Sequence, residues 1–203
     1  MPTPDPHPAA PRAPITGVIL AGGQGSRMGG VDKGLVPLRG RPMVDWVIER
    51  LRPQVDALLI NANQNTERYA AFGHPVFPDD IAGFAGPLAG LHAALARATT
   101  PLVATAPCDS PFLPTDLVSR LHAALIADDA QLAVAHTFAQ AHPVFCLCRR
   151  DVLPHLADFL AGGGRKIDRW YASLRVVAVQ FDDQEEAFRN INTRDELRDA
   201  DGT

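Results

Sequence analysis

The sequence predicts one α/β domain of three layers, with helices on both faces of a mostly parallel, twisted sheet. From residue 15 onward, short apolar runs of strand length alternate with segments whose apolar residues recur at helical spacing. Most of these runs are apolar at neighbouring positions and not only at alternate ones, which is typical of strands buried on both faces. At 203 residues, 46% of them apolar, the chain can bury one large core. We therefore expect a single domain over residues 15–203.

A proline-rich leader precedes this domain. Six prolines fall within residues 1–14, and a segment of this composition has little apolar surface with which to pack. We expect residues 1–14 to be disordered.

The first half of the domain is predicted to contain four strands and three helices. Val44, Val47, Ile48 and Leu51 form an i, i+3, i+4, i+7 stripe, which indicates a helix over residues 43–51. Pro87 suits the first position of another helix. The remaining helix is expected at residues 66–72, and the strands at residues 15–20, 57–60, 75–77 and 102–106.

The second half is predicted to contain three strands and three helices. Leucines spaced four residues apart mark the first helix from Leu117, and the glycines that start at Gly162 end a second helix near residues 152–160. Thr193 and Glu196 have the spacing of a capping box, which indicates that the last helix begins there. The strands are expected at residues 132–135, 144–148 and 175–181.

Polar residues and a glycine-rich loop follow several predicted strands. The loop comes after residues 15–20, and Asn61, Asp79 and Asp109 each stand at or just after a strand end. In Rossmann-like sheets, ligands bind outside the carboxyl ends of the strands. We therefore expect these residues to converge on one site.

The loop after the first strand, LAGGQGSRMGGVDKGL at residues 20–35, holds six glycines together with Arg27, Asp32 and Lys33. Glycines let backbone N–H groups turn toward a ligand, and the two cations can neutralise a triphosphate. The formal net charge is −4, whereas residues 21–42 hold four basic residues against one acidic residue. This local excess favours a compact anionic ligand and argues against nucleic acid as a partner.

The cysteines and the apolar runs restrict the class of protein further. Cys108, Cys146 and Cys148 do not complete a zinc set, and we expect buried, reduced thiols in a cytoplasmic protein. Within a strand, Cys146 and Cys148 would face the same way. No run approaches the roughly 18 apolar residues of a membrane helix, and the early prolines interrupt any signal-peptide core. The sequence predicts no membrane partner.

Three familiar loop motifs do not fit. Val31 and Asp32 stand where a Walker loop needs Lys and then Ser or Thr. Met28 replaces the last glycine of a dinucleotide-binding fingerprint, which argues against a dehydrogenase. A nucleophile elbow around Ser26 lacks both of its glycines.

The loop instead resembles that of the molybdenum cofactor guanylyltransferases, which are nucleotidyltransferases of α/β fold. Their signature L-A-G-G…R-M-G…D-K-G-L is matched nearly letter for letter, and the resemblance runs from about Thr16 to Leu197. The later motifs that are similar to the family are Asn61-Ala62-Asn63, Asp79, Gly86-Pro87-Leu88-Ala89-Gly90, Pro107-Cys108-Asp109-Ser110-Pro111, His142-Pro143 and Asn190-Ile191-Asn192-Thr193.

The resemblance implies a reaction and its cofactor. GMP would be transferred from GTP to the terminal phosphate of molybdenum-molybdopterin, with Mg²⁺ as cofactor and pyrophosphate as the leaving group. No general base is required, because a phosphate nucleophile is already ionised at neutral pH. The resemblance also implies a cytoplasmic enzyme with transient contacts to molybdenum cofactor insertion proteins or molybdoenzyme chaperones.

The same resemblance implies roles for particular residues. Arg27 and Lys33 would stabilise the leaving pyrophosphate, and Asp109 would hold Mg²⁺ as a hard oxygen ligand. The nucleotide-binding set is Leu20, Ala21, Gly22, Gly23, Lys33, Asn61, Asp79 and Asp109. The set expected to face the second substrate is His142, Arg165, Lys166, Asn190 and Asn192.

Within these sets, Asn61 and Asp79 suit recognition of guanine or ribose, because a carboxylate can accept from the N1–H and N2–H groups of guanine. Asn190 and Asn192 are also candidates for a second metal ligand. Asp80, beside Asp79, is expected to be a solvated charge.

Three alternative functions stay open. A CTP-dependent molybdopterin cytidylyltransferase shares the loop, so the choice of base depends on the region of Asn61 and Asp79. A sugar-1-phosphate nucleotidyltransferase would usually have a longer chain. A nucleotide-binding module without catalysis is the third, and the presence of both Lys33 and Asp109 argues against it.

Overall fold

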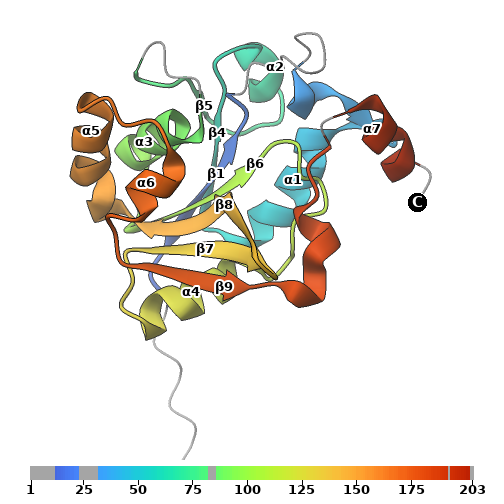
Figure 1. Ribbon diagram of the computed structural model, residues 1–203. Helices are drawn as coiled ribbons and strands as arrows, with labels where there is room; N and C mark the ends of the chain where they lie inside the picture. The colour runs from blue at the N-terminus through green and yellow to red at the C-terminus, as the bar shows by residue number, and fades with distance from the viewer. Residues whose placement is uncertain (1–11, 23–31, 82–85, 192, 202–203) are drawn as a thin grey trace, which may run out of the picture.

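A seven-stranded sheet forms the centre of the molecule, and helices pack on both of its faces (Figure 1). The computed structural model describes residues 12–22, 32–81, 86–191 and 193–201. Within these ranges the strand order is β5-β4-β1-β6-β8-β7-β9. Neighbouring strands pair in parallel, except that β8 is antiparallel to both β6 and β7. The predicted three-layer α/β fold is confirmed.

The strands of this sheet lie close to their predicted positions. Their bounds are β1 Ile15–Leu20, β4 Ala57–Asn61, β5 Val76–Phe77, β6 Leu102–Pro107, β7 Leu132–Thr137, β8 Gln140–Arg149 and β9 Val176–Gln180.

Strand β8 begins at Gln140 rather than at residue 144 as predicted. A tight turn joins it to β7, with Phe138 in the left-handed region at φ 49°, and Gln140 pairs with Thr137. Gln140 and Ala141 are exposed, so the buried apolar pattern used to predict the strand does not extend to them. Cross-strand pairing alone defines this end of β8.

Two groups of helices cover the two faces of the sheet. Helices α1 (Met43–Leu51) and α4 (Leu117–Ala127) pack on one face, together with Tyr69 of α2 (Thr66–Ala70). Helices α3 (Pro87–Arg97), α5 (Leu153–Ala161) and α6 (Ile167–Tyr171) pack on the other (Figure 1). The sheet is therefore apolar on both sides, as predicted by strand sequences that are apolar at neighbouring positions.

The cysteines of β8 follow this division. Cys146 and Cys148 both pack with the α3 and α5 side, whereas Leu147 packs with the α1 side. Both thiols and that of Cys108 are buried and unoxidised, as predicted.

The last helix, α7 (Arg194–Asp201), begins at the predicted capping box. The Thr193 N–H donates to Glu196 Oε2 at 2.9 Å, and the Glu196 N–H donates to Thr193 Oγ1 at 3.1 Å. Leu197 and Ala200 of this helix pack against a small antiparallel ribbon, β2 (Pro37–Leu38) and β3 (Arg41–Pro42). This ribbon was not predicted, because two-residue strands carry no periodic pattern.

The start of the described chain is tied to the domain. Arg12 pairs with Asp56 at 3.0 Å, and Ala13 packs against the core, while residues 1–11 of the predicted leader lie outside the described residues. In the ranges that the structure describes, no helix has both the length and the apolar character needed to span a membrane.

Candidate active site

The carboxyl ends of three adjacent parallel strands form the floor of the site. The Ala21 N–H, just after β1, donates to the Asn61 carbonyl at 2.8 Å. The Cys108 N–H, just after β6, donates to the Leu20 carbonyl at 3.1 Å. These bonds continue the sheet past its strands and hold the backbone of Leu20, Ala21 and Gly22 between the ends of β4 and β6.

The first side-chain cluster of the site gathers around Asp79, which follows β5. Asn61 Nδ2 donates to Asp79 Oδ1 and Asn63 Nδ2 donates to Asp79 Oδ2, both at 2.9 Å. The Asp79 N–H donates back to Asn63 Oδ1 at 2.8 Å. Each carboxylate oxygen therefore has one amide donor and keeps further lone pairs for a ligand. The predicted convergence of Asn61 and Asp79 is present.

Helix α3 fixes the position of Asn61 from above the strand. Asn61 is buried, and its Nδ2 also donates to the Phe77 carbonyl at 3.3 Å. A Cβ atom placed on Gly90 would lie only 2.5 Å from Asn61 Oδ1. Glycine at position 90 thus lets the helix approach the Asn61 amide more closely than any other residue allows.

The second cluster joins the two charged residues that the glycine-rich loop and β6 provide. Lys33 begins the 3₁₀ turn η2 (Lys33–Leu35), and its Nζ lies 3.2 Å from Asp109 Oδ2. The two side chains are only 21% and 13% exposed, so water screens this ion pair less than it screens a surface pair. The arrangement places a cation and a hard oxygen ligand side by side.

The donor set around Asp109 suits a metal that is shared with a ligand. Among the described residues, no group of three or more His, Cys, Asp or Glu side chains could hold a metal ion by itself. Mg²⁺ is usually held by one or two carboxylates together with phosphate oxygens and water. The single carboxylate of Asp109 fits that mode.

The segment before α7 is attached to the same place. The Ile191 N–H donates to the Asp109 carbonyl at 3.0 Å, and Ser110 Oγ donates to Asn190 Oδ1 at 2.6 Å. Asn190 therefore lies close to Asp109. Asn192, Arg27 and Gly23 lie outside the described residues.

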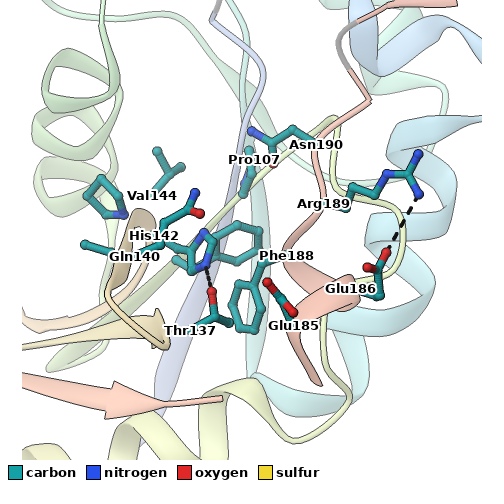
Figure 2. Close-up of a pocket in the computed structure, with 13 residues that line it drawn as sticks. Pro107, Thr137, Gln140, His142, Val144, Glu185, Glu186, Phe188, Arg189 and Asn190 are labelled. Atoms are coloured by element: carbon teal, nitrogen blue, oxygen red, sulfur yellow. Dashed lines mark hydrogen bonds and ion pairs between the residues drawn. The ribbon is translucent and has the colours of Figure 1, made fainter. Parts of the chain in front are cut away.

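A pocket of about 510 Å³ opens beside this segment, between the end of β6, the start of β8 and the 3₁₀ segment η5 (Asp182–Phe188). Figure 2 shows Pro107 and Asn190 at one end of it and Thr137 at the other. His142 lines the pocket, stacked on Phe188 with ring centroids 4.7 Å apart.

His142 has a fixed polar partner within this pocket. Its Nε2 lies 2.7 Å from Thr137 Oγ1 (Figure 2). Burial, with a smaller effect from nearby His136, lowers its pKa. His142 belongs to strand β8, and Thr137 and Phe188 fix the position of its ring.

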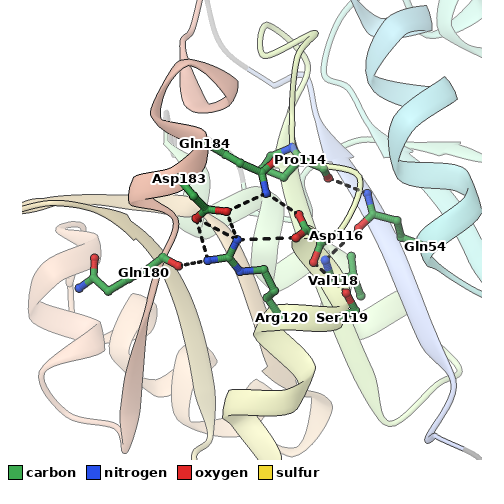
Figure 3. Close-up of polar contacts among 9 residues, drawn as sticks. All are labelled: Gln54, Pro114, Asp116, Val118, Ser119, Arg120, Gln180, Asp183 and Gln184. Atoms are coloured by element: carbon green, nitrogen blue, oxygen red, sulfur yellow. Dashed lines mark hydrogen bonds and ion pairs between the residues drawn. The ribbon is translucent and has the colours of Figure 1, made fainter.

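Helix α4 fixes the wall of the pocket that η5 forms. Arg120 pairs with Asp183 at 2.9 Å and donates to the Gln180 carbonyl, while Gln184 Nε2 donates to Asp116 Oδ1 at 3.0 Å (Figure 3). These polar contacts attach the first residues of η5 to α4 and to Asp116, the residue just before that helix.

Arg165 and Lys166 occupy a different element from the residues around Asp109. Both are exposed, in the loop between α5 and α6. The Arg165 guanidinium donates to the Leu160 and Gly164 carbonyls of its own loop, at 3.2 and 2.6 Å. Tyr171, at the end of α6, donates to the Pro143 carbonyl at 2.6 Å, which attaches this helix to the start of β8.

Asp80 is exposed, as the sequence predicts for a solvated charge, and it also forms an ion pair. Both of its carboxylate oxygens accept from the Arg97 guanidinium at 2.7 Å. Those hydrogen bonds lower its pKa. Arg97 is one helix length away at the end of α3, so sequence spacing could not indicate the pair.

Comparison with known proteins identifies the family. Residues 17–177 match the family described as the MobA-like NTP transferase domain. The chain belongs to this family. The resemblance carried by the glycine-rich loop and the later motifs is thereby confirmed.

Curated relatives of this MobA-like chain share a name. A molybdenum cofactor guanylyltransferase from Cupriavidus taiwanensis is 55% identical over 192 residues, which cover 92% of this chain and 96% of that protein. One of the same name from Cupriavidus necator is 56% identical over 192 residues, with the same shares covered.

Solved structures share the fold. Molybdopterin-guanine dinucleotide biosynthesis protein A from Archaeoglobus fulgidus has a TM-score of 0.77 at 24% identity, covering 93% of this chain and 97% of that one. A 4-diphosphocytidyl-2C-methyl-D-erythritol synthase from Anaerococcus prevotii has a TM-score of 0.72 at 13% identity, covering 94% and 97%. One fold thus serves proteins of different names.

Several residues of this MobA-like site were not assigned from the sequence. Asn63 contacts Asp79 from a position two residues after Asn61, within a motif already noted but without a role. Tyr69 of α2 donates to Asp32, the residue before Lys33. Asn65, one helical turn earlier and just before α2, donates to the same carboxylate. The only sequence signal for Tyr69 is its place in an expected helix, which does not indicate a polar contact.

Proposed function

We propose that this chain transfers GMP from GTP to the terminal phosphate of molybdenum-molybdopterin, forming the guanine dinucleotide cofactor and releasing pyrophosphate. One observation carries the proposal: the Lys33–Asp109 ion pair lies at the same sheet edge as the Asn61–Asp79–Asn63 cluster. The first can act on phosphates and the second on a base. The names of the curated relatives support the same reaction.

Asp79 recognises guanine in this proposal. Guanine presents two neighbouring donors, N1–H and N2–H, to which the two oxygens of one carboxylate are complementary. Cytosine presents one donor, the N4 amino group, beside acceptors at N3 and O2 that a carboxylate repels, so it can satisfy only one of the two oxygens. Because Asn61 and Asn63 each hold one oxygen at 2.9 Å, the carboxylate is oriented before the nucleotide arrives. The backbone of Leu20, Ala21 and Gly22 lies alongside as further contact surface.

Lys33 and Asp109 act on the triphosphate. Lys33 neutralises negative charge that develops on the departing pyrophosphate, which favours the transition state over the bound substrate. Asp109, with the nucleotide phosphates, would hold Mg²⁺, and the ion would supply charge neutralisation at those phosphates. The proposed part of Arg27 is a second positive charge from the glycine-rich loop.

The second substrate is placed in the 510 Å³ pocket beside Asn190. Its terminal phosphate attacks the α-phosphorus of GTP, the bond to the β-phosphate breaks, and pyrophosphate leaves. His142 and Asn190 line the pocket, and Arg165 and Lys166 are proposed to add positive charge from the α5–α6 loop. Asn192 is proposed to contribute with Asn190.

The proposal includes a cellular location and protein partners. We propose a cytoplasmic location, which the three unoxidised cysteines support. A cofactor intended for other enzymes must be handed over, so transient contact with molybdenum cofactor insertion proteins or molybdoenzyme chaperones is part of the proposal.

The test is formation of product by the full-length protein. With GTP, Mg²⁺ and molybdenum-molybdopterin, we expect pyrophosphate release and the guanine dinucleotide, identified by mass spectrometry. Asp109→Asn keeps the shape of the side chain but removes its charge, and we expect a loss of turnover on the order of 100-fold or more. Binding of GTP without any product would instead support a nucleotide-binding module without catalysis. Unaltered turnover by Asp109→Asn would contradict the proposed role of Asp109.

A further inference from the structure

A buried tyrosine lies where the two charged residues of the site meet. Tyr69 of α2 is fully buried, and its hydroxyl donates to Asp32 Oδ1 at 2.5 Å. Asn65, just before the same helix, donates to Asp32 Oδ2 at 3.0 Å. Tyr69 of α2 and Asn65, the residue just before α2, therefore hold both carboxylate oxygens of Asp32, which precedes Lys33.

The same hydroxyl also lies close to the other neighbours of the Lys33–Asp109 pair. A Cβ atom on Gly34 would lie 2.5 Å from the Tyr69 hydroxyl oxygen and 3.1 Å from Cys108 Sγ. Gly34 follows Lys33, and Cys108 precedes Asp109. The Tyr69 hydroxyl thus packs among residues directly attached to both members of the ion pair.

The chemistry of the hydroxyl suits a constant donor. Burial is the main cause that raises the pKa of Tyr69 well above its usual range, followed by the nearby Cys108 and the Asp32 contact. The group therefore stays protonated and keeps donating. Asp32 does not cap η2 with its side chain, so its carboxylate serves this contact instead of the turn that it precedes.

We propose that Tyr69 is a positioning residue for GMP transfer, which holds Asp32 and thereby keeps Lys33 in place against Asp109. The inference rests on the proposed function, because that function makes the Lys33–Asp109 pair responsible for phosphate chemistry. Tyr69 touches no reacting atom in this account. Its effect passes through the backbone that joins Asp32 to Lys33.

The effect should fall on turnover more than on GTP binding. The base-binding cluster at Asn61 and Asp79 belongs to β4 and the segment after β5, and the Tyr69 hydroxyl is directed at Asp32 instead. A displaced cation lowers transition-state stabilisation even when substrate still binds. For Tyr69→Phe we expect kcat to fall about tenfold or more, with the dissociation constant for GTP changed by less than about twofold.

A double-mutant cycle shows whether Tyr69 acts through Asp32. Asp32→Ala should lower kcat by itself, and adding Tyr69→Phe should then change kcat by less than about twofold, because the contact is already gone. The matched control is Thr100→Val, which removes another partly buried hydroxyl, bonded to Thr16 and Leu102 away from the site. It should lower the melting temperature without lowering kcat.

Rescue provides a second, independent variant pair. In Asp32→Asn, the new amide nitrogen faces the Asn65 amide nitrogen, so we expect a loss of turnover. Adding Asn65→Asp restores a donor–acceptor pair between positions 32 and 65, while the amide oxygen introduced at position 32 still accepts from Tyr69. Position 65 has φ 51°, which an aspartate tolerates as well as an asparagine does. The exchanged pair should recover most of kcat, and this test remains available should Tyr69→Phe fail to fold.

The outcomes separate the two proposals. A wild-type protein that forms no guanine dinucleotide contradicts the proposed function, whatever Tyr69 does. An active wild type with unchanged kcat in Tyr69→Phe overturns the positioning role of Tyr69, and so do additive losses in the double mutant. No recovery by the exchanged pair contradicts the step on which that role depends, the positioning of Lys33 through Asp32. A lower kcat, unchanged GTP affinity and a non-additive cycle support it.

Discussion

At the scale of single residues, the proposed function makes the choice of base depend on one carboxylate held by two amides. Asp79 is oriented by Asn61 and Asn63 rather than by a cation, so it can keep its negative charge for the ligand. Neutral donors fix direction without supplying a competing opposite charge. This arrangement suits recognition of two adjacent N–H groups.

Asp79→Asn tests that account directly. The variant presents an amide nitrogen where one acceptor stood, so we expect GTP affinity to fall on the order of 10- to 100-fold, as for a lost charged hydrogen bond. The measurement is calorimetric titration with GTP. The matched control is Asp80→Asn, next along the chain, whose carboxylate pairs with Arg97. That change should cost at most about 1 kcal/mol of stability and leave GTP affinity unaltered. Equal losses from both variants would contradict base recognition by Asp79.

Sequence reasoning at this scale succeeds where a residue's role follows from its place in the chain. Asn61, Asp79 and Asp109 come at strand ends, and topology brings such ends together. Sequence reasoning does not identify the contacts of Asn63, those of Tyr69 or the Asp80–Arg97 pair. Those contacts depend on loop paths and side-chain rotamers, which no period or spacing encodes.

At the scale of secondary-structure elements, the lack of a side chain at Gly90 lets helix α3 lie close to Asn61 of β4. Gly90 lies within the helix, where glycine costs about 1 kcal/mol relative to alanine. Its benefit is the close approach to the buried Asn61 amide, where a Cβ would lie 2.5 Å from Oδ1. The glycine thus lowers the stability of α3 but lets the helix fix the position of the Asn61 amide, which is proposed to bind the nucleotide.

Gly90→Ala should separate stability from binding. We expect the new methyl to displace the Asn61 amide and weaken GTP binding by about tenfold, while the alanine's helix propensity offsets part of the strain. Titration with GTP and thermal unfolding measure the two effects. In an Asn61→Ala background, Gly90→Ala should have little further effect on GTP binding, because the displaced group is absent. A full loss in that background would mean that Gly90 acts elsewhere.

Elements differ in how well their sequences predict them. Helix α1 has the predicted bounds, and α5 ends before the predicted glycines, because apolar spacing and helix-ending residues agree there. The β2–β3 ribbon, α6 and η5 were not predicted. They are short, and contacts such as those of Arg120 with Asp183 and Gln180 define where η5 lies.

At the scale of the whole molecule, the sheet edge brings together two clusters with different tasks. In the proposed function, the side formed by β1, β4 and the segment after β5 binds the base, and the side formed by η2 and the end of β6 binds the phosphates. The antiparallel β8 and η5 add the pocket next to Asn190. The parallel part of this plan is predictable from alternating strands and helices. The pocket is not, since it depends on the reversed direction of β8.

The measurement that tests the central claim most directly is calorimetric titration of the full-length protein with GTP and, separately, with CTP, each with Mg²⁺. The two-donor edge of guanine matches the Asp79 carboxylate, so we expect GTP to bind at least about tenfold more tightly than CTP. CTP binding as tight as that of GTP, or tighter, would contradict guanine recognition at Asp79 and assign the chain to cytidylyl transfer.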